Sequence, residues 1–191
     1  MNGVKISRTS WIETLVLKNS AKEHFSQLTN FVTVVICSLL LILSAKIKVD
    51  LYPVPMTLQP LAVLLISMLC GRNIAVASVS LYLFQGMVGI PVFAYGGGLP
   101  YLLGPTGGFL FGFLFASIII GELADRGWGK SHFKSVFAML LGLIVIYTFG
   151  IFQLSVLKGF DFAIINGFKP FIVGDFYKLC LLYTSDAADE L

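Results

Sequence analysis

The feature that most constrains this chain is a succession of long apolar segments joined by short connections. The segments span residues 31–45, 57–70, 74–93, 107–123 and about 136–157, and another begins near Phe171. About 20 apolar residues in a helix cross a bilayer core of about 30 Å, and backbone groups in lipid must be hydrogen-bonded internally. The first two segments are shorter and must tilt or use flanking residues. The pattern predicts an all-α membrane protein, a bundle of six transmembrane helices.

Composition agrees with a lipid environment and excludes several other classes of protein. Of 191 residues, 57% are hydrophobic and 12% charged, against about 25% charged in a typical soluble domain. The net charge of +3 is scattered, and no basic patch with interleaved aromatic residues suggests nucleic acid. Three cysteines and two histidines have no metal-binding spacing, and no nucleophile–base pair is visible. The sequence therefore predicts neither an enzyme nor a metal or cofactor site.

Loop charges predict the orientation in the membrane. Eight cations fall in the segments on the N-terminal side of the membrane: Lys5, Arg8, Lys18, Lys22, Arg72, Arg126, Lys130 and Lys134. Four fall in the opposite loops: Lys46, Lys48, Lys158 and Lys169. Cytoplasmic loops carry an excess of Lys and Arg. Both termini are therefore predicted to be cytoplasmic, with the glycine-rich loop 93–108 facing outward.

Small residues point to two different roles along the chain. Glycines and prolines concentrate between Gly86 and Gly108, and non-helical backbone at membrane depth is tolerated mainly where it lines a cavity. This density suggests a loop folded over a site, with simple turn formation as the alternative. Gly108, Gly112 and Ala116 share a helix face, which predicts close helix packing within the bundle, or a surface for a partner helix.

The stretch "ADRGWGKS", residues 124–131, imitates a phosphate-binding loop. The true motif needs a strand before it and a helix after it, so that backbone N–H groups surround the phosphates. Here a membrane helix precedes it, so it is interpreted as a basic cytoplasmic turn. If this chain moves a solute uphill, another subunit must supply the energy.

Two charged residues stand where hydrocarbon is expected. Asp175 and Lys178 are three residues apart and share one helix face. Asp175 could cap the last helix while Lys178 extends toward the interface. Alternatively, a carboxylate and an ammonium side by side could bind a ligand with matching donors and an acceptor. The residues alone leave both interpretations open.

The segments "PVPMTLQPLAVLL", "SLYLFQGMVGIPVFA", "LLGPTGG" and "GFKPFIVGDFYK" resemble, in order, the hallmark segments of the BioY family. These proteins are the substrate-binding S components of energy-coupling-factor (ECF) biotin transporters. The resemblance covers about residues 31–178. It implies a six-helix subunit of the plasma membrane that captures biotin from outside and works with a transmembrane coupling protein and ATPase subunits.

The resemblance also implies which residues bind the ligand. In the family, the Asp and Lys of the last motif help to hold the biotin head group, and these match Asp175 and Lys178. A carboxylate can accept from the ureido N–H groups and an ammonium can donate to the ureido carbonyl. Further candidates are aromatic walls, close-approach glycines and a polar side chain: Tyr82, Phe93, Tyr147, Gly97, Gly98 and Gln59. The partner of the biotin carboxylate is not predicted. An S component for another vitamin and a structural membrane protein without transport are the alternatives.

The last residues do not look like part of the fold. Residues 180–190, "CLLYTSDAADE", match one reading frame of a common transposase sequencing adapter. We therefore expect a cytoplasmic extension at 1–30, a membrane domain at 31–179 and adapter read-through at 180–191. The last helix would then keep only its first two or three native turns. The same codons in adapter-free genomic DNA would contradict this expectation.

Overall fold

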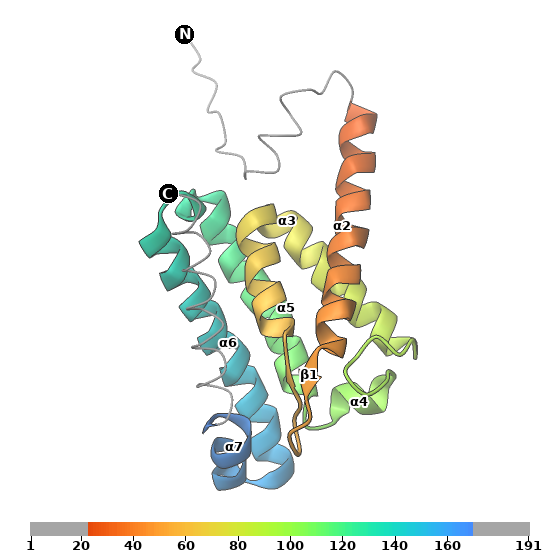
Figure 1. Cartoon of the computed structure of the whole chain (residues 1–191), viewed down its shortest axis with the longest axis vertical. Helices are drawn as coiled ribbons and strands as arrows, with labels where there is room; N and C mark the ends of the chain where they lie inside the picture. The colour runs from red at the N-terminus through yellow and green to blue at the C-terminus, as the bar shows by residue number, and fades with distance from the viewer. Residues whose placement is uncertain (1–22, 170–191) are drawn as a thin grey trace.

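The computed structural model describes residues 23–169, and its elements are helical apart from one small hairpin (Figure 1). In chain order they are α2 (Glu23–Lys46), β1 (Lys48–Val49), β2 (Met56–Thr57), α3 (Gln59–Met87), α4 (Leu99–Leu103), α5 (Gly107–Asp125), the 3-10 helix η1 (Trp128–Lys130), α6 (His132–Lys158) and α7 (Phe160–Gly167). Helices α2, α3, α5 and α6 each contain a stretch long and apolar enough to cross a membrane. The prediction of an all-α membrane protein is confirmed.

Helix α3 consists of two arms, which the sequence predicts as two separate segments. It contains Gly71, whose φ of 76° and ψ of 177° are not helical, and the ribbon reverses direction there (Figure 1). Glycine adopts this conformation without the steric cost that a Cβ would impose. The predicted segments 57–70 and 74–93 are thus the two arms of α3. The second arm ends at Met87, so the prediction that a helix continues to Phe93 is wrong: Gly89, Pro91 and the following glycines form a loop.

Other predicted boundaries differ less. Helix α2 begins at Glu23, so the expected division between residues 30 and 31 falls inside this helix. Helix α7 was not expected, and it follows α6 after Gly159, whose φ is 91°. The predicted sixth segment near Phe171, with Asp175, Lys178 and residues 180–191, lies outside the described residues.

The bundle is held together where small residues let helix backbones approach. A Cβ on Gly108 would lie 2.3 Å from the carbonyl oxygen of Phe149 in α6, and one on Gly112 would lie 2.9 Å from the Cα of Ile146. Glycine at these positions therefore permits the close contact of α5 with α6. The prediction that this face of small residues serves packing within the bundle is confirmed at these two glycines.

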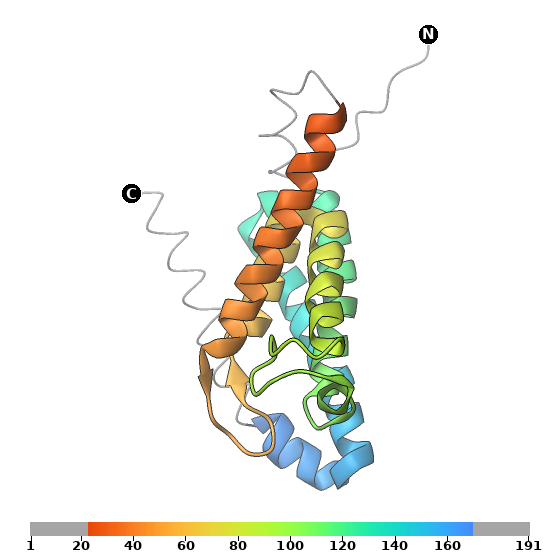
Figure 2. The ribbon, with the colours of Figure 1, turned by 90° about the vertical axis from the view of Figure 1, so that its right-hand side faces the viewer.

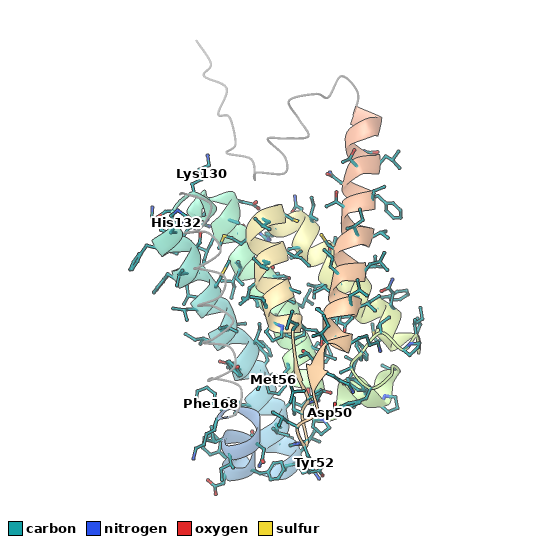
Figure 3. The ribbon with its side chains drawn as sticks, viewed as in Figure 1. Asp50, Tyr52, Met56, Lys130, His132 and Phe168 are labelled. Atoms are coloured by element: carbon teal, nitrogen blue, oxygen red, sulfur yellow. The ribbon has the colours of Figure 1, made fainter. Side chains whose placement is uncertain are left out.

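The two ends of the bundle carry different elements. The reversal of α3, η1 and the start of α6 form one end, where Figure 3 labels Lys130 and His132. The hairpin, α4 and α7 gather at the opposite end (Figure 2), where Figure 3 labels Asp50, Tyr52 and Met56. The stretch 124–131 begins with the last two residues of α5 and continues through a turn and η1, in agreement with its interpretation as a turn. The described members of the two predicted sets of loop cations lie at opposite ends.

Candidate functional site

A cavity lies at the end of the bundle that carries the hairpin and the glycine-rich loop. The space between its lining atoms is about 510 Å³, a value that includes open solvent. Its wall comes from the hairpin, the start of α3, the loop 93–106, α5 and α6: Val54, Pro55, Thr57, Gln59, Pro60, Phe93, Ala94, Tyr101, Thr106, Phe109, Leu110, Phe113, Ile146 and Tyr147. Residues from five parts of the chain, between Val54 and Tyr147, therefore meet around one space.

Aromatic rings form much of the cavity wall and contact one another. Phe93 stacks on Tyr101, with ring centroids 5.0 Å apart and 24° between the planes. On the other side, Phe109 meets Tyr147 edge to face at 6.4 Å. Phe168 (labelled in Figure 3) packs edge to face on Tyr147 at 5.6 Å. Such pairs fix ring orientation beyond simple area burial, so the wall is a preformed apolar surface.

A short hydrogen-bond chain places polar atoms at this wall. The Thr57 hydroxyl donates to Gln59 Oε1 at 3.4 Å, and Gln59 Nε2 donates to the Tyr82 hydroxyl at 2.6 Å. Gln59 lines the cavity, whereas Tyr82 is fully buried behind it. The Tyr82 and Phe93 rings meet edge to face, with ring centroids 5.5 Å apart. Tyr82 thus supports two lining residues, Gln59 and Phe93. Its predicted contact with ligand stays a prediction.

The predicted glycines Gly97 and Gly98 are not among the residues that line the cavity. A Cβ on Gly97 would lie 2.2 Å from the carbonyl oxygen of Ile90, and Gly98 has a φ of 99°. The Gly98 N–H donates to the Gly86 carbonyl at 2.7 Å, which ties the loop to the end of α3. In this structure the two glycines shape the loop that carries Phe93.

Glycine is also required directly behind the aromatic wall. A Cβ on Gly86 would lie 1.9 Å from Cζ of Phe93, so the ring rests against the bare backbone of α3. Phe93 itself is 0% exposed. On the opposite side of the cavity, Gln153 Nε2 donates to the carbonyls of Leu102 and Gly104, at 3.0 and 2.7 Å. These contacts fix both halves of the loop around the cavity.

Charged groups stand beside the cavity, and none of the described lining residues carries a charged side chain. The Tyr95 hydroxyl donates to Asp50 Oδ1 at 2.6 Å, and Lys48 lies 3.2 Å from both Asp50 Oδ1 and the centre of the Tyr95 ring. The Tyr95 bond and then Lys48 lower the pKa of Asp50, and the bond to Asp50 raises the pKa of Tyr95 to about 12. Burial raises the pKa of Tyr101, so this phenol stays neutral and able to donate.

Sequence reasoning placed three of its candidates in the cavity wall and missed several others. Gln59, Phe93 and Tyr147 line it, whereas Asp175 and Lys178 lie outside the described residues. The lining residues that were not proposed as ligand contacts include Tyr101, Thr106 and Phe109. Their signal was available, because all three lie in or beside the hallmark segment "LLGPTGG". That segment was used only to support the resemblance.

Comparison with known proteins agrees with this architecture. The chain is 41% identical over 135 residues to a probable biotin transporter BioY of Pyrococcus horikoshii, covering 70% of this chain and 79% of the relative. It is 39% identical over 143 residues to the biotin transporter BioY of Thermotoga maritima, covering 73% and 83%. A crystal structure at 2.1 Å of the S-component for biotin from an ECF-type ABC transporter superposes with a TM-score of 0.73 at 25% identity, covering 84% of this chain and 90% of that one.

The sequence model of the BioY family matches residues 17–185 of this chain. The match includes every described residue and ends inside the segment 180–191, whose adapter origin remains a prediction. Because the matched region covers far more than half of the chain, the chain belongs to the BioY family.

Proposed function

We propose that this chain is the S component of an ECF transporter for biotin, which it binds in the cavity between the hairpin, the glycine-rich loop, α5 and α6. The observation that carries the proposal is this preformed aromatic cavity, in a chain whose relatives are named biotin transporters. The chain is a membrane-embedded binding subunit and not an enzyme.

The lining of the cavity suits the less polar part of biotin. Phe93, Tyr101, Phe109 and Tyr147 offer ring faces and edges to a thiophane ring and a valeryl chain. Gln59, Thr57 and the neutral Tyr101 hydroxyl supply the few polar groups that fix orientation in most small-molecule sites.

Asp175 and Lys178 are proposed to hold the ureido ring. Phe168, seven residues before Asp175 in the sequence, packs on the lining residue Tyr147, which supports a role for the following motif at the cavity. The carboxylate would accept from the two ureido N–H groups and the ammonium would donate to the carbonyl. Charge-assisted hydrogen bonds of this kind are about twice as strong as neutral ones.

The orientation and the partners follow from the same proposal. With both termini in the cytoplasm of a plasma-membrane protein, the cavity end would face outward, because that end carries fewer Lys and Arg in the two predicted sets. The stretch 124–131 lacks the strand that a phosphate-binding loop requires. Energy would therefore come from the ATPases of an ECF module, transmitted through its transmembrane coupling protein.

The test is binding of labelled biotin to the detergent-purified protein, expressed from the gene resequenced across codons 170–191. We expect saturable binding that unlabelled biotin displaces and that riboflavin and thiamine do not. Asp175→Asn should weaken binding at least about ten-fold, because a charge-assisted bond is lost. Asp161→Asn is the matched control, because Asp161 lies exposed in α7 and does not line the cavity. Absence of saturable binding by the parent protein would refute the proposed function.

A further inference from the structure

The last residue of α2 reaches across to the loop that forms the cavity wall. Lys46 Nζ donates to the carbonyl oxygen of Pro91 at 2.8 Å and to that of Phe93 at 2.7 Å. Both distances are typical of charge-assisted bonds from an ammonium. A single cation therefore joins the end of one membrane helix to two loop carbonyls, the first of them 45 residues later in the chain.

Backbone hydrogen bonds tie both ends of this loop to the end of α3, among them the bond of the Gly98 N–H to the Gly86 carbonyl at 2.7 Å. Between Val88 and Gly98 the loop is non-helical, and at its middle Phe93 makes an isolated bridge to Gly96, with N···O distances of 2.8 and 3.4 Å. The longer of these bonds ends on the Phe93 carbonyl, which is also the oxygen that Lys46 holds at 2.7 Å. The ammonium therefore supplies the shorter of the two contacts to this carbonyl.

The side chain of the residue held in this way is part of the cavity. The Phe93 ring lines the cavity and stacks on the Tyr101 ring, with ring centroids 5.0 Å apart. It also meets the Tyr82 ring edge to face, with centroids 5.5 Å apart. A displacement of the Phe93 backbone would carry the ring away from its seat against Gly86 and disturb its stacking on Tyr101. Lys46 does not line the cavity itself.

We infer that Lys46 is a positioning residue for biotin binding: through the carbonyls of Pro91 and Phe93 it holds the aromatic wall of the cavity in its binding-competent place. The inference rests on the proposed function, because its readout is biotin affinity. The inference goes beyond the proposed function by assigning a role in binding to Lys46, a residue of α2 that does not line the cavity.

The energetic argument is one of population. When only a fraction of the molecules has a binding-competent wall, the apparent Kd rises by the inverse of that fraction. Without the ammonium, the middle of the loop loses two bonds from a charged donor and keeps the bridge to Gly96, while the ends of the loop stay bonded to the end of α3. A fall of the competent fraction to about one tenth would raise Kd about ten-fold.

The experiment compares four versions of the full chain in detergent: the parent protein, Lys46→Met, Lys46→Arg and Lys158→Met. Met keeps most of the length and apolar stem of Lys46 but has no donor, and Arg restores a charged donor that can reach two acceptors. Lys158 is the matched control, because it is the exposed last residue of α6 at the same end and does not line the cavity. Each version is measured for biotin Kd and for its unfolding midpoint without ligand.

We expect Lys46→Met to bind biotin about ten-fold more weakly, with Lys46→Arg and Lys158→Met within about three-fold of the parent. The ligand-free unfolding midpoint of Lys46→Met should change little, which separates positioning of the wall from general stability. Equal affinity of Lys46→Met and the parent would overturn the inference, as would an equal loss in Lys158→Met.

Two further outcomes are distinguishable. If Lys46→Met does not fold, Lys46→Gln replaces it. The Gln side chain is shorter and uncharged, so the Lys46→Gln protein should bind biotin more weakly than the Lys46→Arg protein. Equal biotin affinity of these two proteins would overturn the inference. If the parent protein itself does not bind biotin, the proposed function fails and the inference fails with it.

Discussion

The two ends of this bundle are stabilised in different ways. At the end where α3 reverses, Arg72 and Arg126 pair with Glu122 at 3.1 and 3.0 Å, and the Arg72 N–H donates to Asp125 at 3.2 Å. The Arg72 contacts join the reversal of α3 to the last turn of α5, whereas the Arg126–Glu122 pair lies within the end of α5. At the cavity end, the side chains of Lys46 and Gln153 donate to carbonyls of loops.

The difference teaches how a membrane protein can combine a fixed scaffold with a binding site. Non-helical backbone needs partners for its polar groups, and at the cavity end long side chains supply some of them in addition to the hairpin and the backbone bonds of the loop. The opposite end has few such groups, because each helix passes to the next through a short turn. We expect substitutions at the two ends to separate stability from binding, in the order that follows.

The largest effect on stability is expected for Gly121→Ala at the end where α3 reverses. The added Cβ would lie 2.4 Å from the Arg72 Cα and 2.7 Å from its N, and backbone atoms cannot move aside as a side chain can. Alanine gains up to about 1 kcal/mol of helix propensity, but overpacking typically costs about 1–3 kcal/mol, and a clash with backbone lies at the upper end. The ligand-free unfolding midpoint should fall clearly, with the biotin Kd of the folded protein nearly unchanged.

Gly129→Ala is the control at the same end, because its added Cβ would meet nothing closer than 3.5 Å. It should leave the unfolding midpoint where it is. A Gly121→Ala protein as stable as the parent would show that α3 and α5 can separate here, and would remove the contrast between a rigid end and an adjustable one.

Gly86→Ala should reverse this pattern at the cavity end. The added Cβ would lie 1.9 Å from Cζ of Phe93, so the ring must leave its seat and enter the space that the ligand needs. We expect biotin affinity to fall at least about ten-fold, a difference of about 1.4 kcal/mol. The loss of stability should be smaller than for Gly121→Ala, because a side chain yields and not a backbone. Unchanged affinity would place the ligand away from Phe93.

The membrane helices could be predicted from sequence because their signal is local. Apolar runs of sufficient length give the bounds of α5 to within two residues and those of α6 to within about four, and Gly108 with Gly112 predicted the contact that these helices make. The predicted division between segments 57–70 and 74–93 is confirmed by the non-helical Gly71, but the sharpness of the reversal there could not be predicted this way. A glycine between two apolar runs fits a loop as well as a sharp reversal, and the choice depends on the contact of Arg72 with Gly121 in α5.

The cavity was predicted less completely because its wall is assembled from five elements. Aromatic type predicted Phe93 and Tyr147, of which Phe93 also lies in a hallmark segment. Tyr101 and Phe109 are aromatic and flank the hallmark segment 102–108, but they are not among the predicted ligand contacts. Lys46 shows the limit of such reasoning. In the sequence it is one more loop cation, and only the fold brings its ammonium to the carbonyls of Pro91 and Phe93.

A smaller effect is expected for Arg72→Met, which removes one ion pair from the end where α3 reverses. The Arg72 and Glu122 side chains are 50% and 37% exposed, and exposed pairs contribute little to stability. The unfolding midpoint at low salt should fall by no more than about 2 °C, and the fall should shrink in high salt. Lys134→Met, which removes a cation near the start of α6, is the comparison. A loss as large as that of Gly121→Ala would mean that charge pairing, not backbone contact, fixes this end.

The smallest effect is a pH dependence confined to the cavity end. Because Tyr95 and Lys48 lower the pKa of Asp50, the contribution of this carboxylate to stability is present above the ordinary aspartate pKa and is lost as the pH falls through the lowered value. The raised pKa of Tyr95, about 12, gives a contribution present below the ordinary tyrosine value and lost as the pH rises through about 12. Stability should therefore be insensitive to these groups around neutral pH.

Asp50→Asn isolates this effect, because an amide keeps an acceptor for Tyr95 but does not titrate in the acid range. Between about pH 5 and about pH 3, a range around the ordinary aspartate pKa, we expect the unfolding midpoint of the parent protein to fall slightly more than that of Asp50→Asn. The exposed position of these side chains keeps the difference small. Identical acid profiles for the two proteins would mean that the link between hairpin and loop contributes nothing measurable, leaving Lys46 and Gln153 as the contacts that hold the cavity end.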